Sequence, residues 1–146
     1  MCIRDRGVAV WPAQAINYTN KTQFLFRIQK GILDINDTGV NDYIKPENQR
    51  VPFRNMIYIG DSDTDIPCMS LVNANGGHSI GVYDPFKKDK EKVYKMMRHH
   101  RIRYYAPADY SNGSKLDTLV KQIIRKTAAY EVLEGEYIHC KYEAEE

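Results

Sequence analysis

The sequence has few cysteines, and none of them are arranged in pairs. Cys2, Cys68 and Cys140 are the three among 146 residues, and their spacing fits neither a zinc site nor a disulfide framework. We therefore expect reduced thiols. Glycine and proline are also scarce, with 9 and 6 residues, which excludes disordered and fibrous classes. A hydrophobic content of 42% instead suits the core of a single globular domain.

Long apolar runs and a strong net charge are absent as well. No run approaches the roughly 20 apolar residues that span a bilayer, and no apolar signal segment follows the N-terminus. The net charge is only +2, and the lysines and arginines are scattered along the chain. A basic stripe of the kind that binds nucleic acid is therefore missing. We expect a cytoplasmic protein with neither a membrane nor a nucleic-acid partner.

The first six residues, MCIRDR, can be translated from a transposase adaptor that is used to prepare sequencing libraries. We expect residues 1–6 to be non-native and the natural sequence to extend upstream of Gly7. Residues 7–133 would then be the C-terminal part of a longer domain, followed by a polar, acidic tail over 134–146. The alternative is a genuine short N-terminus.

Predicted strands and helices alternate along the chain. Apolar runs predict strands at about 14–18, 55–59, 78–84 and 102–106. Helical spacing and capping residues predict helices at about 21–30, 66–74, 85–100 and 114–133. Turn-forming residues predict a long connector over 33–53, with a helical turn near 37–44. The tail from Glu134 is expected to be loosely held.

This alternation is typical of a parallel sheet covered by helices. The second apolar run, Asn55 to Ile59, is expected to be a central strand that is buried on both faces. Ligands of such sheets bind at the carboxyl ends of the strands. We therefore expect a ligand site in the segment that follows this strand.

Three aspartates follow that strand in MIYIGDSDTDIPCM, at positions 61, 63 and 65. Carboxylate oxygens suit a hard divalent cation, which would offset the repulsion among the three acids. The simpler alternative is that they cap the next helix, although one carboxylate would be enough for that. An EF-hand loop is disfavoured because Ile66 and Val72 replace its glycine and glutamate. A DxDxT nucleophile loop is disfavoured because Asp65 occupies the fifth position, and a GDxxxD metal site remains.

The residues GDSDTDIP at 60–67, after NMIYI, closely resemble the fourth motif of the haloacid dehalogenase-like (HAD) hydrolases. The segments SIGVYDP and APADY, the latter followed by a capped helix, look like the C-terminal elements of the same superfamily. Ser62 departs from the commonest pattern, which has glycine there. The resemblance implies an α/β fold, a Rossmann-like αβα sandwich with a parallel central sheet.

The resemblance also implies magnesium-dependent hydrolysis of a small phosphomonoester through an aspartyl-phosphate. Asp61 would contact Mg2+ directly and Asp65 directly or through water, whereas Asp63 falls on a variable position without a ligand role. The family further needs a lysine beside the phosphate, at the start of a helix. Lys21 fits that context, and Lys45 is the alternative, although Pro46 disfavours helix at Lys45 itself.

Two parts of that machinery are not found in the sequence. The first is the DxDx[TV] loop that would carry the nucleophile and the general acid, since DINDT at 34–38 has the wrong spacing and no preceding strand. The second is a strand that ends in the phosphate-binding Ser or Thr before Lys21. Truncation explains this absence, and we expect little activity from the chain alone. The rival interpretations are a non-catalytic module that binds a divalent cation and a regulatory pseudophosphatase. The four histidines, His78, His99, His100 and His139, lack metal-ligand spacing and are expected in surface or capping roles.

Overall fold

The computed structural model of the chain describes residues 2–12, 14–87 and 89–145. The chain divides into two compact units, Met1–Arg50 and Val51–Glu146, and each is described by itself. The whole of the predicted aspartate site lies in the C-terminal unit.

The N-terminal unit begins with a hairpin in which β1 (Cys2–Asp5) pairs antiparallel with β2 (Val8–Pro12). The strand predicted at 14–18 is wrong, because residues 14–17 are irregular and lead into a turn. Two local hydrogen bonds explain the difference. The Asn17 side chain accepts from the Thr19 N–H at 2.9 Å, and the Asn20 side chain accepts from the Asn17 N–H at 2.8 Å. Such bonds offer the backbone an alternative to strand pairing.

Helix α1 (Lys21–Lys30) confirms the predicted helix and is followed by Gly31 as its C-cap, with φ 75°. The connector after it contains two short 3-10 helices, η1 (Thr38–Asn41) and η2 (Pro46–Asn48), and η1 confirms part of the predicted helical turn. The buried Arg27 guanidinium holds the connector against α1. It donates to the carbonyl oxygens of Asp34 and Ile35 at 2.5 and 2.9 Å.

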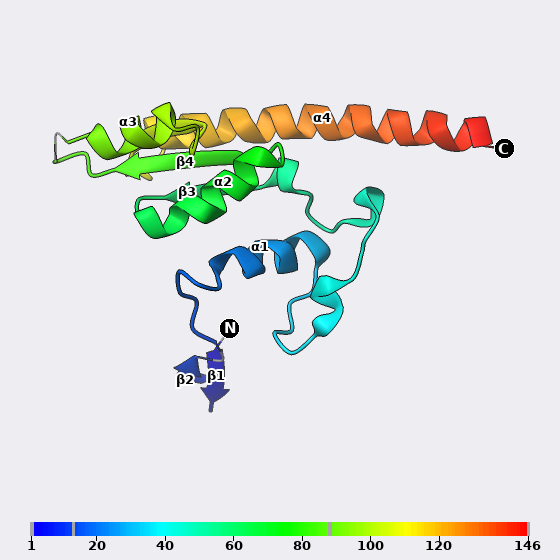
Figure 1. Cartoon of the computed structure of the whole chain (residues 1–146), viewed down its shortest axis with the longest axis horizontal. Coiled ribbons are helices and arrows are strands. Elements are labelled where there is room, and N and C mark those ends of the chain that lie inside the picture. Colours follow the sequence, from blue (N-terminus) through cyan, green and yellow to red (C-terminus); the bar gives the residue numbers. More distant parts are fainter. Residues whose placement is uncertain (1, 13, 88, 146) are drawn as a thin grey trace. The chain divides into compact units, whose positions relative to one another are not determined.

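The C-terminal unit contains a three-stranded parallel sheet, which confirms the predicted α/β class (Figure 1). It consists of β3 (Ile57–Gly60), β4 (His78–Tyr83) and β5 (Tyr104–Pro107), in the order β3-β4-β5. The expectation that the strand before the aspartates is central is wrong. Within the described residues β4 is the central strand and β3 lies at an edge, where Ile59 is 37% exposed.

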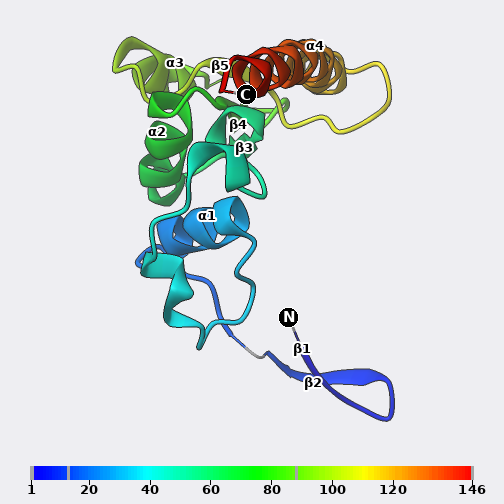
Figure 2. The same cartoon turned by 90° about the vertical axis from the view of Figure 1, so that its right-hand side faces the viewer.

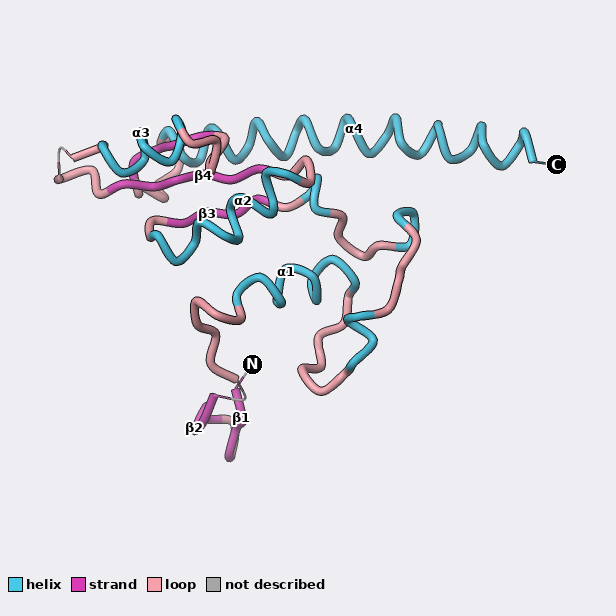
Figure 3. The backbone as a smooth tube through the Cα atoms, viewed as in Figure 1, coloured by secondary structure: helices cyan, strands magenta, loops and turns pink. Residues whose placement is uncertain are grey.

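Helices cover both faces of this sheet, as Figure 2 shows, and Figure 3 traces the same helices and strands along the backbone. Helices α2 (Ile66–Ala74) and α3 (Glu91–Arg98) pack on one face through a core of Met69, Val93, Met96 and Ile102. Helix α4 (Lys115–Glu145) packs on the other face through a core of Ile80, Val82, Ala106, Leu116 and Ile123. Alternate residues of the strands serve the two cores, as the pleat of a strand requires.

Two helix boundaries differ from the predicted ones. Helix α3 begins at Glu91 rather than near Pro85. Asp84 and Asp89 accept hydrogen bonds from the N–H groups two residues later, at 2.9 Å each, and these Asx turns delay the helix. Helix α4 continues to Glu145 instead of ending near residue 133. Its second half extends beyond the sheet, where Leu133 and Tyr137 are exposed (Figure 1).

No described helix is both long enough and apolar enough to cross a membrane. Cys68 and Cys140 are reduced thiols outside any disulfide, as predicted, and the Cys2 side chain lies outside the described residues.

Candidate functional site

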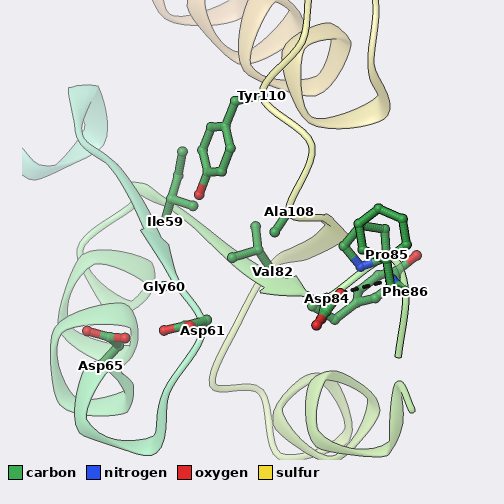
Figure 4. A pocket seen from close by; sticks show the side chains of 11 residues that line it. Ile59, Gly60, Asp61, Asp65, Val82, Asp84, Pro85, Phe86, Ala108 and Tyr110 are labelled. Carbon is green, nitrogen blue, oxygen red and sulfur yellow. Dashed lines mark hydrogen bonds between the residues drawn. The ribbon is translucent and has the colours of Figure 1, made fainter. Parts of the chain in front are cut away.

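An open cavity lies at the carboxyl ends of β3 and β4, where the sequence predicted a ligand site (Figure 4). Its volume is about 570 Å³. Residues from the ends of β3 and β4 and from the segments after β3, β4 and β5 line it. The lining residues are Ile59, Gly60, Asp61, Asp65, Val82, Tyr83, Asp84, Pro85, Phe86, Ala108 and Tyr110. Of the three predicted aspartates, the cavity brings together Asp61 and Asp65 and leaves out Asp63.

Asp65 is buried, at 7% exposure, and its carboxylate is held by its own loop. Asp65 Oδ2 accepts from the backbone N–H and the hydroxyl of Ser62, at 3.2 and 2.8 Å. These bonds form a capping box at the 3-10 helix η4 (Asp63–Asp65), which leads into α2. Asp65 therefore has a capping role at η4, but its side chain makes no capping bond at α2, so the capping alternative holds only for the short helix.

The other oxygen of Asp65 is held by Tyr58 on β3. The phenol donates to Asp65 Oδ1 at 2.9 Å, so both carboxylate oxygens accept hydrogen bonds. Burial and, after it, this hydrogen bond raise the pKa of the Tyr58 phenol above its ordinary value, so Tyr58 keeps its proton and remains a donor. The sequence interpretation missed Tyr58. Its signal was weak, because a tyrosine in a strand is an ordinary core residue.

Gly60 lets the aspartate loop approach the strand. A Cβ atom at this position would lie 2.6 Å from Met69 Cε and 2.8 Å from Asp65 Cβ. Any side chain there would push η4 and α2 away from β3, and Asp65 with them. The glycine of the GDSDTDIP motif thus has a steric role in placing the second acid.

Asp61 contrasts with Asp65. It directly follows β3, its side chain is exposed, and it lines the cavity. Within the described parts of the chain, its carboxylate makes no hydrogen bond and no ion pair. Figure 4 shows Asp61 and Asp65 on the same side of the cavity. The site therefore pairs one carboxylate that is free to bind a ligand with one that is fixed in place.

Asp63 lies outside the cavity and interacts with α3. Its carboxylate is 3.5 Å from the Lys92 ammonium, and its side chain is 80% exposed. An exposed pair of this kind contributes little to stability. That Asp63 has no ligand role stays a prediction.

A third acid, Asp84, lines the opposite side of the cavity, together with Phe86 (Figure 4). Asp84 Oδ1 accepts from the Phe86 N–H at 2.9 Å, and Phe86 itself is 93% exposed. The sequence interpretation did not single out Asp84. A signal existed, because Asp84 follows β4 in the same way as Asp61 follows β3, and the ends of neighbouring parallel strands lie side by side.

No group of three or more His, Cys, Asp or Glu side chains among the described residues is arranged to hold a metal ion. That finding bears on sites built wholly from protein ligands. Magnesium usually binds through one or two carboxylates and keeps several waters or phosphate oxygens. The two carboxylates of Asp61 and Asp65 on one cavity wall fit that pattern.

The two candidate lysines belong to the N-terminal unit. Lys21 is the first residue of α1, as predicted. Lys45 precedes η2 with φ −56° and ψ 144°, which is the non-helical conformation expected before Pro46. The partnership of either lysine with the aspartates stays a prediction.

The histidines take different roles from one another. His100 adopts φ 55° just after α3, and His99 and His100 are exposed, in agreement with the expected surface and capping roles. His139 lies 3.4 Å from Glu143 on α4. The expectation is wrong for His78, which is only 2% exposed. Its place at the start of the central strand explains the burial.

Comparison with known proteins adds little to this geometry. No protein-family profile matches the chain, and no solved structure matches it. The chain is 26% identical over 101 residues to a protein of Borreliella burgdorferi that is named as uncharacterized. The match covers 69% of this chain and 34% of that protein, so the chain spans about a third of its relative's length.

Proposed function

We propose that this chain carries the metal-binding half of a magnesium-dependent phosphohydrolase site of the HAD type. The observation that carries the proposal is the pairing of a free carboxylate, Asp61, with a fixed one, Asp65, in one cavity at the carboxyl end of a parallel sheet. The GDSDTDIP motif adds the resemblance. The proposed substrate is a small phosphomonoester, and the proposed location is the cytoplasm.

Asp61 would bind Mg2+ directly. Asp65 would bind Mg2+ directly or through water. When bound, the ion would polarise a phosphoryl oxygen and offset negative charge. The residues of this chain supply the fixed position: Tyr58 and Ser62 hold the Asp65 carboxylate by hydrogen bonds.

Titration of the full chain with Mg2+ by calorimetry tests the metal site. We expect saturable binding that Asp61→Asn abolishes, because this change removes the free carboxylate. Asp63→Asn is the matched control, and it should leave binding intact because Asp63 lies outside the cavity. Equal losses in the two variants would overturn the site. Selectivity for Ca2+ over Mg2+ would favour the alternative, a non-catalytic cation-binding module.

An assay with mixed phosphomonoesters tests whether this chain carries only the metal-binding half of the active site. We expect no turnover by this chain, because a DxDx[TV] nucleophile loop is not found in its sequence. Lys21, or alternatively Lys45, would act beside the phosphate in an active protein. Robust turnover that Asp61→Asn abolishes would overturn the assignment of Asp61 as a metal ligand rather than a nucleophile.

A further inference from the structure

A second, smaller cavity lies at the amino end of the central strand. Its volume is about 180 Å³. Residues from three separate segments line it: Arg54 and Asn55 from the 3-10 helix η3 (Phe53–Asn55), His78 from β4, and Lys126 from α4. The six residues of β4 separate it from the aspartates by about 17 Å. It is therefore distinct from the proposed metal site.

Two buried polar atoms of this cavity's lining residues have no partner within the described residues. His78 is 2% exposed, and its Nδ1 makes no hydrogen bond. Asn55 Oδ1 is also buried without a partner. The amide nitrogen of Asn55 is already used, because the Asn55 side chain hydrogen-bonds to Glu131, and only its NH2 group can donate to a carboxylate. Buried polar atoms are rarely left unpaired, so a polar ligand in this cavity would supply the missing hydrogen-bond partners.

The two charged residues that line the cavity, Arg54 and Lys126, are both basic. Arg54 is paired with Glu131, and the Arg54 Nε lies 2.8 Å from the Glu131 carboxylate. Glu134 accepts a hydrogen bond from the Tyr130 hydroxyl. Lys126 makes no ion pair with any residue that the structure describes. Burial lowers the pKa of His78 first, and the positive charges of Lys126 and Arg103 lower it further. An anion would neutralise the charge that Lys126 brings.

We propose that this cavity binds a small protonated oxyanion, of which inorganic hydrogen phosphate is the simplest example. Lys126 supplies the charge, and His78 donates from Nδ1 to an anionic oxygen. Asn55 Oδ1 accepts from the hydroxyl of the anion. A fully deprotonated oxyanion of the same shape cannot make the last bond, because it would place an acceptor against an acceptor.

Two-dimensional 1H–15N NMR of the full chain tests the proposal. Phosphate is added in the presence of excess chelator, so that no divalent cation can recruit it to the aspartates, and the ionic strength is kept constant. We expect saturable shifts at the amides of His78, Thr127 and Asn55. Sulfate, which has the same shape but carries no proton at neutral pH, should bind about tenfold more weakly or worse, because one hydrogen bond is lost and Asn55 Oδ1 stays unpaired.

Variants identify the site. Lys126→Gln should weaken phosphate binding by about tenfold, since a hydrogen bond to a charged group is lost. Lys126 is exposed, so the fold should survive, and an unchanged spectrum elsewhere checks this. Lys141→Gln, at an exposed lysine of the same helix outside the cavity, is the matched control and should bind like the wild type. Asp61→Asn should also bind normally.

Three results would overturn the proposal. The first is the absence of saturable shifts, which would leave an ordered water as the partner of the two polar atoms. The second is binding that Lys126→Gln and Lys141→Gln weaken equally, which would indicate non-specific attraction. The third is equal affinity for sulfate and phosphate, which would exclude Asn55 as an acceptor.

Discussion

At the carboxyl end of the sheet, Asp65 accepts hydrogen bonds from residues three and seven positions before it in the chain. At the amino end, the polar groups of Arg54, His78 and Lys126 meet from segments far apart in the sequence. The first arrangement satisfies both oxygens of its buried acid, whereas the second leaves buried atoms of His78 and Asn55 unpaired. The comparison shows that hydrogen bonds between residues close in sequence can satisfy a buried acid completely. Packing of distant segments can instead leave a cavity with unpaired polar atoms that a ligand can bind.

The largest expected effect is at the amino end. A Cβ atom at Gly77 would lie 2.3 Å from the Phe53 carbonyl oxygen and 2.6 Å from Val72 Cγ1. Since the first of these is a backbone atom, Gly77→Ala should lower the free energy of unfolding by about 3 kcal/mol, measured by urea denaturation. Gly135→Ala is the control, because nothing lies within 4 Å of its Cβ position, and it should stabilise α4 by about 0.5–1 kcal/mol. Equal midpoints for the two variants would contradict the close approach of Gly77, the residue before β4, to η3.

Gly60→Ala makes the corresponding change at the carboxyl end. Its Cβ atom would meet the flexible end of Met69 and the side chain of Asp65, so part of the strain can relax. We expect a loss of about 1–2 kcal/mol in the free energy of unfolding, which is smaller than that for Gly77→Ala. If Gly60→Ala were the more damaging of the two, the carboxyl end would be the more tightly packed one.

Tyr58→Phe removes one support of Asp65 and keeps the ring. We expect a loss of about 1–2 kcal/mol in the free energy of unfolding, because a hydrogen bond to a carboxylate disappears in a half-buried place. Tyr142→Phe, at an exposed tyrosine of α4, should leave stability unchanged. A Tyr58→Phe variant as stable as Tyr142→Phe would mean that the capping box alone holds Asp65.

The smallest effect concerns Arg54 and Glu131 at the amino end. The hydrogen bond from Arg54 lowers the pKa of Glu131, so this pair stabilises the fold above the ordinary pKa of glutamate. The stabilisation is lost as the pH falls through the lowered value. Glu131→Gln should lower the free energy of unfolding by less than about 1 kcal/mol at neutral pH, since both side chains are about one-third exposed. In acid the variant should be as stable as the wild type. Glu136→Gln, at an exposed residue of the same helix, should show no such pH dependence in urea titrations.

Elements that rest on local chemistry could be predicted from the sequence. The αβ alternation, the helices α1 and α2 and the pairing of Asp61 with Asp65 at one strand end follow from periodicity, caps and the position of the acids. The strand predicted at 14–18 failed because side-chain bonds of Asn17 and Asn20, which apolar patterning does not register, fold the backbone into a turn.

Features that depend on distant segments could not be predicted. The edge position of β3 follows from which strands pair, and a single strand does not encode its neighbours. The same limit applies to the bond between Tyr58 and Asp65, since a strand tyrosine gives no sign of its partner. His78 was expected at the surface because a lone histidine carries no burial signal. Its position became clear only from the central place of β4 in the sheet.

The hydrogen bonds that hold Asp65 have a consequence for the entropy of ligand binding. Because Ser62 and Tyr58 fix the loop between β3 and α2 through bonds within the protein, its backbone is ordered before any ligand arrives. A loop that becomes ordered only when its ion binds loses conformational entropy on binding, and this loss lowers the affinity. A cation that binds to Asp61 would therefore bind beside a pre-organised loop. Its affinity would depend on the free energy of removing water from the ion rather than on the entropy of ordering the backbone.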